Sequence, residues 1–183
     1  MSDGKLDTHA AGQECESLPT YSQAEVLVSN LPYIAMTVLG AAVFAVGPAG
    51  SAWKWVAAGA YLVYGAAGAL WVMIFICPYC HFWDTRACPC GYGQIAAKLR
   101  EKKDGDRFKE KFRRHIPVIV PLWLIPPLAG VLMVLQSFSW PLLALLLVFA
   151  VDAFIILPLV STKHGCAACP QKDSCPWMGR KAQ

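Results

Sequence analysis

Seven of the eight cysteines in this 183-residue chain stand in two compact groups. The members are Cys77, Cys80, Cys88 and Cys90 in the first cysteine group, and Cys166, Cys169 and Cys175 in the second cysteine group. Each group contains a C-x-x-C pair, and such pairs with further cysteines nearby have the spacing of metal ligands. Four thiolates complete a tetrahedral set, so the first cysteine group predicts a whole metal site.

The second cysteine group is one thiolate short of such a set. A fourth ligand has to come from elsewhere in the chain, and the candidates are His164, His81 and Cys15. His164 is the nearest of these in the sequence. The alternative is a site that keeps an open position.

Proline directly follows four of the grouped cysteines, namely Cys77, Cys88, Cys169 and Cys175. A Cys-Pro step ends ferredoxin-type cysteine runs, although the intervals differ here, and thiolates are the ligands that iron–sulfur clusters use. We therefore expect one or two iron–sulfur clusters, most simply of the 4Fe–4S type. Structural zinc is the alternative cofactor, and a thiol oxidoreductase or heavy-metal transporter is a third interpretation.

Two sharper interpretations of the Cys77–His81 stretch fit less well. A C-x-x-C-H sequence attaches c-type haem, but that attachment normally takes place outside the cytoplasm. A glutaredoxin-type dithiol opens a helix, whereas this pair follows the end of a long apolar block, where the helix dipole has the wrong sign. Metal binding is the better explanation of both cysteine groups.

Four long apolar blocks must position these cysteines. They run over residues 31–48, 53–77, 116–138 and 140–160, in a chain that is 56% hydrophobic and only 15% charged. A helix needs about 20 apolar residues to cross the hydrocarbon core, and in lipid its backbone groups must bond within the segment. The sequence predicts an all-α integral membrane protein, a bundle of four transmembrane helices with a cysteine-rich cytoplasmic metal-binding face.

The basic residues indicate the orientation of the bundle. The connection over residues 78–115 holds ten Lys or Arg, whereas Lys54 is the one charge near the two short connections. By the positive-inside rule, the long connection and both termini lie in the cytoplasm, which for a bacterial-type system means the inner membrane. No signal peptide is recognisable, so we expect the N-terminal segment to be kept.

The segments outside the four spans complete the organisation. Residues 1–30 form a cytoplasmic tail in which 21–30 is expected as a short interfacial helix, and residues 161–183 form a second, cysteine-rich tail. In the 78–115 loop, short helices are expected over 94–103 and around Phe108 and Phe112. Their basic side chains suit anionic lipid headgroups.

Asp152 is the one acidic residue inside a predicted span. A charge at that depth costs about 2.5–3.5 kcal/mol on insertion scales, so intramembrane acids are candidates for function. Asp152 is a candidate proton or quinone contact. The alternative is a protonated carboxyl that hydrogen-bonds a neighbouring helix.

Four spans with Cys-Pro steps at a cytoplasmic face resemble the four-helix membrane subunits of quinol-linked anaerobic electron-transfer systems. The chain differs from those subunits in cysteine spacing and has no full ferredoxin domain. The resulting hypothesis is a non-catalytic subunit that relays electrons to a membrane partner or quinone within a larger redox complex. The second hypothesis is a zinc-stabilised structural or assembly protein; nucleic acid is not an expected partner.

Overall fold

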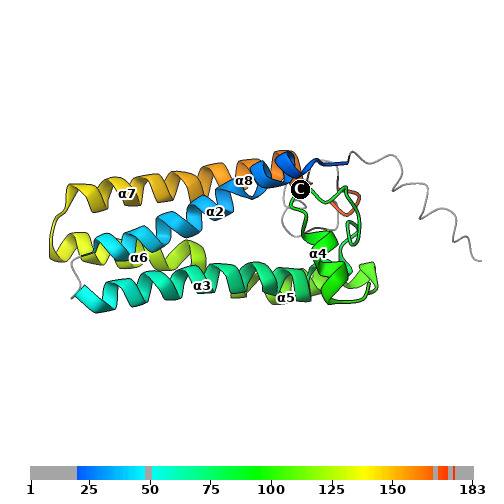
Figure 1. Ribbon diagram of the computed structural model, residues 1–183, viewed down its shortest axis with the longest axis horizontal. Coiled ribbons are helices and arrows are strands. Elements are labelled where there is room, and N and C mark those ends of the chain that lie inside the picture. Colours follow the sequence, from blue (N-terminus) through cyan, green and yellow to red (C-terminus); the bar gives the residue numbers. More distant parts are fainter. Residues whose placement is uncertain (1–19, 48–50, 167–168, 173–174, 176–183) are drawn as a thin grey trace, which may run out of the picture.

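Four long helices lie side by side in the computed structural model (Figure 1). The structure describes residues 20–47, 51–166, 169–172 and 175, with the backbone alone at 164–166. The long helices are α2 (Gln23–Val46), α3 (Ser51–Phe75), α6 (Pro121–Gln136) and α7 (Trp140–Val151). All four helical runs are long and apolar enough to cross a membrane, as expected for a multi-pass membrane protein.

The fourth run continues past α7 without leaving the helical path. It passes through the π-helix η4 (Asp152–Ile156), α8 (Leu157–Val160) and a second π-helix, η5 (Ser161–Cys166). π-Helical segments are rare in proteins, and those that occur are often found at functional sites. Here the first one begins at the only acidic residue of the span.

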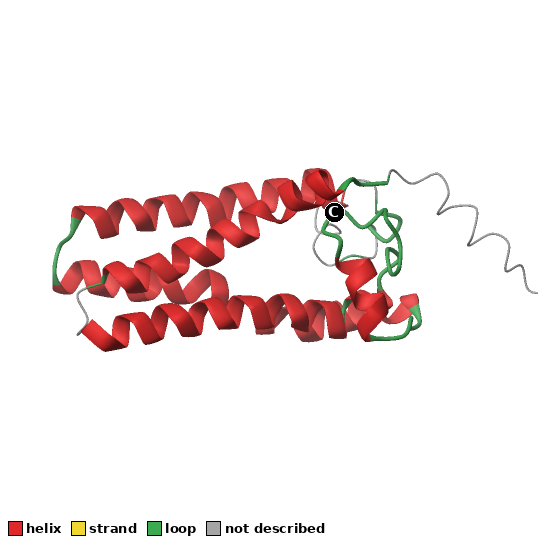
Figure 2. Cartoon of the chain, viewed as in Figure 1, coloured by secondary structure: helices red, strands yellow, loops and turns green. Residues whose placement is uncertain are grey.

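The short helices gather at one end of the bundle, where the loops are also concentrated (Figure 2). They are η1 (Cys77–Tyr79), α4 (Tyr92–Leu99), η2 (Gly105–Arg107), α5 (Phe108–His115) and η3 (Ile116–Val118). We call this the cysteine end, because all cysteines of the described residues lie there. At the opposite end, α6 and α7 are joined by residues 137–139 alone.

Helix α2 begins earlier than the apolar pattern predicts. Ser22 caps it through a capping box with Glu25, in which the Ser22 backbone N–H donates to Glu25 Oε2 over 2.8 Å. The helix then runs without a break through Pro32. Residues 23–30 are therefore its first turns, so the short helix expected over 21–30 is continuous with the first span.

The bundle interior is filled by apolar side chains and by close helix contacts. Met36, Leu122 and Phe149 are fully buried in the main core. A Cβ added at Gly130 would lie 2.4 Å from Leu146, so α6 and α7 approach at a distance that only glycine permits. Most outward side chains on the four helices are large and apolar, as a lipid-facing surface requires.

Helix α6 continues through Pro126 and Pro127, which lie inside it. Pro126 has no N–H to donate to the Leu122 carbonyl one turn earlier. The Tyr61 hydroxyl from α3 donates to that carbonyl over 2.6 Å and replaces the missing donor. A side chain from a neighbouring helix thereby satisfies a backbone group inside the span.

Candidate functional site

The first cysteine group begins where α3 ends. Cys77 opens the 3-10 helix η1, whose second residue is Pro78, and the Cys80 N–H closes this turn on the Cys77 carbonyl over 3.0 Å. The Cys77 side chain is buried against Met73 and Ala96. The tight turn therefore holds the two cysteines of the pair at the base of the bundle.

Residues 82–91 form a loop that brings Cys88 and Cys90 back to this turn. Gly91 adopts a left-handed φ of +69°, which glycine accepts without strain. A Cβ added to Gly93 would lie 2.1 Å from the Phe82 carbonyl oxygen, so only glycine fits this crossing. The Gly93 N–H donates to Cys88 Sγ over 3.4 Å, which ties the start of α4 to the cysteine loop.

The other thiols of the first cysteine group lie within electrostatic range of Cys77. They belong to Cys80, Cys88 and Cys90. All of them are free thiols, as are Cys169 and Cys175 of the second group. The structure thus brings together the four residues that the sequence grouped.

The second cysteine group docks onto the first. Cys175 is buried in a cluster with Ile76 and Phe108, and Cys80 packs against the same cluster. The His81 N–H donates to Gln171 Oε1 over 3.0 Å, which ties the C-terminal segment to the residue after Cys80. Segments about 90 residues apart in the sequence therefore meet at the cysteine end.

The Cys80 thiol lies within electrostatic range of cysteines of both groups, namely Cys88 of the first and Cys169 and Cys175 of the second. Burial raises the pKa of Cys80, and a hydrogen bond with the backbone of Phe82 partly offsets this effect. Burial likewise raises the pKa of Cys169, with a partial offset from the backbone of Gln171. In the metal-free protein these thiols are held protonated at neutral pH, whereas a bound cation would favour the thiolates.

Two contacts with the start of the chain fix the loop of the first group. Asn30 of α2 donates through Nδ2 to the Cys90 carbonyl over 3.0 Å. The Tyr21 N–H donates to the Arg86 carbonyl over 3.0 Å. Helix α2 thus acts as a support for the cysteine loop, a role that the sequence did not reveal because the partners are about 60 residues apart.

The sequence predicted metal sites, but the described side chains are not arranged in a metal-ligand geometry. Within the described ranges, no three His, Cys, Asp or Glu side chains are arranged to hold a metal ion. A metal-binding face at this end stays a prediction, as do the ligand roles of the individual cysteines. Cys15 and the side chains of His164 and Cys166 lie outside the described residues.

Asp152 lies in the interior of the bundle. Its side chain is 6% exposed, and its Oδ2 atom has no hydrogen-bond partner among the described residues. The segment that it opens, η4, packs against α2. An unsatisfied buried carboxyl oxygen is costly, so it is compatible with a functional group and less so with the hydrogen-bonded alternative.

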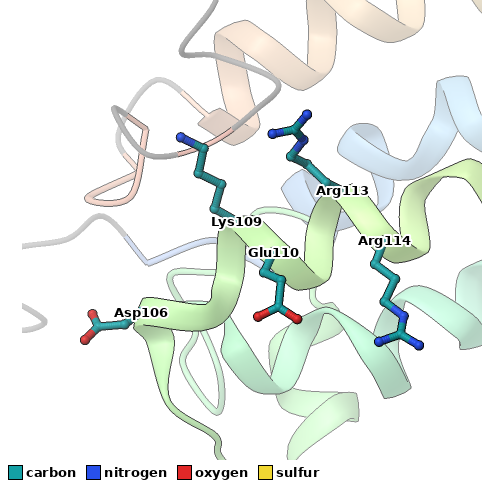
Figure 3. Close-up of a pocket in the computed structure, with 5 residues that line it drawn as sticks. All are labelled: Asp106, Lys109, Glu110, Arg113 and Arg114. Atoms are coloured by element: carbon teal, nitrogen blue, oxygen red, sulfur yellow. The ribbon is translucent and has the colours of Figure 1, made fainter.

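Helix α5 presents a basic surface at the cysteine end. Phe108 is buried under it, whereas Lys109, Arg113 and Arg114 are exposed and, with Asp106 and Glu110, line a shallow hollow (Figure 3). Figure 3 shows Lys109 and Arg113 extending from one side of the helix and Glu110 from another. The basic loop therefore forms an amphipathic helix, as expected from the spacing of Phe108 and Phe112.

Tyr79 is a residue that the sequence reasoning missed. The ammonium groups of Lys103 and Lys111 lie 5.7 and 5.8 Å from the centre of its ring, which is within cation–π range. The Lys103 N–H also donates to the Pro78 carbonyl over 2.8 Å. The position of an aromatic residue between Cys77 and Cys80 could have indicated this role from the sequence. Tyr79 holds the basic loop next to the turn that carries these cysteines.

No protein-family model, curated protein or solved structure matches the chain. The functional assignment therefore depends on the physical chemistry of the cysteine end alone.

Proposed function

We propose that the protein is a membrane electron-transfer subunit that binds one or two iron–sulfur clusters at the cysteine end. The observation that carries this proposal is the packing of cysteines from both groups at the cysteine end, where Cys80 contacts the cluster that contains Cys175. Soft thiolates in this number suit iron–sulfur clusters, and hydrogen bonds to sulfur tune the potential of such clusters. The N–H of Gly93 would supply one such bond at Cys88.

The described thiols must still move into a ligand set when a cluster binds. The loop that carries Cys88 and Cys90 has two glycines, and Cys169 follows the last helical residue of its chain segment closely. Metal binding that draws flexible segments together is common in small thiolate sites. The contacts made by Asn30 of α2 and by Tyr79 would hold the surrounding loops in place while the thiols move.

The same proposal gives the protein an orientation and partners. The ten basic residues of the 78–115 loop favour a cytoplasmic location of the cysteine end and of both termini, in the inner membrane. The exposed basic face of α5 would then lie near anionic lipid headgroups. Electrons would pass from another subunit of a redox complex through the cluster to a membrane partner or a quinone, with Asp152 as the candidate proton or quinone contact.

Anaerobic purification in detergent, followed by iron and sulfide analysis and by visible and EPR spectroscopy, tests this proposal. We expect stoichiometric iron and sulfide, a broad visible absorption that bleaches on reduction with dithionite, and an EPR signal in one redox state. Stoichiometric zinc without iron would contradict the electron-transfer function.

Zinc binding in a structural or assembly protein is the second candidate. It is favoured by the position of the thiols, which lie between the end of α3, α5 and the C-terminal segment and so could tie these elements together. In that case chelation would loosen the cysteine end, and no redox signal would be present.

A thiol oxidoreductase is the least favoured function. Reactive cysteines need a lowered pKa, whereas burial raises the pKa of both Cys80 and Cys169. Slow alkylation of these thiols would separate this function from the other two.

A further inference from the structure

The second cysteine group lacks a fourth thiolate, and the fold suggests where that ligand lies. Cys166, Cys169 and Cys175 are its three members, and Cys166 is the last residue of η5. A closed tetrahedral site needs one more donor. The sequence candidates were His164, His81 and Cys15, none of which belongs to the first cysteine group.

Packing places Cys80 with the second group as well as with the first. Cys80 contacts the cluster of Ile76, Phe108 and Cys175, whereas Cys77, three residues earlier, is buried in a different cluster with Met73 and Ala96. The 3-10 turn between the two cysteines separates their side chains in this way.

The backbone around Cys80 is tied to the same segment. The residue after Cys80 donates its N–H to Gln171 Oε1 over 3.0 Å, and Gln171 lies between Cys169 and Cys175. The Lys172 N–H donates to the Cys169 carbonyl over 3.1 Å and the Cys175 N–H to the Lys172 carbonyl over 3.2 Å, so this segment is a turn that closes beside Cys80. Cys80 is therefore held next to the second group by both side-chain packing and a hydrogen bond.

We propose that Cys80 is the fourth thiolate ligand of the second cysteine group, so that Cys80, Cys166, Cys169 and Cys175 bind one metal ion or cluster. This inference rests on the proposed metal-binding function. Since Cys80 also lies near Cys88, it links the two groups, and a thiolate that bridges two metal centres would give each centre four thiolates from seven cysteines. The two groups then form one joint site and not two independent ones.

Zinc binding by the full-length chain tests the assignment, because Zn²⁺ reports on a four-thiolate set without cluster assembly. The starting variant replaces Cys77, Cys88 and Cys90 with serine and keeps only Cys80 from the first group. We expect it to bind one Zn²⁺ in competition with a chromophoric chelator. Adding Cys80→Ser should lower the affinity at least 100-fold, whereas adding Cys15→Ser, His81→Ala or His164→Ala should leave the affinity unchanged.

Two results would overturn the assignment: an unchanged affinity in the Cys80→Ser variant, or a starting variant that is helical and monodisperse but binds no Zn²⁺. Should the starting variant not fold, the unmodified chain gives the answer. Loaded with Zn²⁺ and treated with increasing chelator, it should keep Cys80 protected from iodoacetamide for as long as Cys169 is protected. Alkylation of Cys80 while Cys169 stays protected would also overturn the assignment.

The outcome for the wild-type chain separates this inference from the proposed function. If purified wild-type protein binds neither iron nor zinc, the metal-binding function itself fails. If it binds metal but the Cys80→Ser variant keeps the affinity of the second group, only the assignment of Cys80 fails.

Discussion

The two cysteine groups differ in how the fold holds them. The first group is enclosed by the structure: α3 ends in its turn, α4 follows its loop, and Asn30 of α2 bonds the Cys90 carbonyl. The described part of the second group is a short turn laid onto this framework through Gln171 and Cys175. The first group therefore acts as a template, and the second group depends on it for its position.

Gly93→Ala should have the largest effect on stability, because it disrupts the packing of the first cysteine group, on which the second depends. The new Cβ would lie 2.1 Å from the Phe82 carbonyl oxygen, and this backbone group cannot move aside as the end of a flexible side chain can. We expect a loss of about 2–4 kcal/mol in the free energy of unfolding, measured by denaturant titration in detergent micelles.

Gly59→Ala is the matched control, because a Cβ at Gly59 of α3 meets no atom within 4 Å. It should be neutral or slightly stabilising, by up to about 1 kcal/mol, since alanine is the better helix former. Equal effects of the two substitutions would show that the crossing beside Phe82 does not require glycine at position 93.

Thiol reactivity should show the effect of burial on one cysteine of each group. Burial raises the pKa of Cys80 to about 12 and raises the pKa of Cys169 above its ordinary value. A raised pKa lowers the thiolate fraction at neutral pH, so alkylation of these two thiols should be slow at pH 7. Their rates should increase about tenfold per pH unit up to pH 9, because the thiolate is the nucleophile.

Mass spectrometry of iodoacetamide-treated, metal-free protein measures these rates for each cysteine. A short unfolded peptide that contains Cys80 is the reference, and its rate should level off near pH 9. Fast alkylation of Cys80 at pH 7 in the folded protein would favour the thiol-oxidoreductase function instead.

Asn30→Ala should weaken the template to a smaller degree. It removes the donor to the Cys90 carbonyl and leaves that part-buried group without this partner. A loss of about 1–2 kcal/mol in the free energy of unfolding is expected. Limited proteolysis within residues 82–93 should increase in parallel, and an unchanged cleavage rate would argue against a supporting role for α2.

Gln171→Ala should have the smallest effect on stability, about 0.5–1.5 kcal/mol, because it removes one hydrogen bond to the His81 N–H. Its effect should be confined to the second group. Alkylation of Cys169 should become faster while that of Cys77 stays the same, as measured by mass spectrometry. Equal acceleration at both cysteines would mean that the two groups do not differ as described.

Much of the helical architecture follows from the sequence. Four apolar blocks must form helices in lipid, because their backbone groups have no other partners there, and an even number of spans brings both cysteine groups to the same end. The helix around Phe108 and Phe112 was also recognisable from its spacing. The helix expected over 21–30 is part of one continuous helix, because Ser22 caps a helix that begins at Gln23 and enters the span directly.

The sequence by itself thus determined the number of spans, the common end of the cysteines and the chemistry that their thiols offer. Only the tertiary structure decided that Cys80 packs against the cluster that contains Cys175, that Asn30 supports Cys90 and that Tyr61 satisfies the Leu122 carbonyl. The physical reason is that helix formation in lipid is a local requirement of each segment. Contacts between loops and between helices depend instead on how side chains far apart in the sequence pack together, and no local pattern encodes that packing.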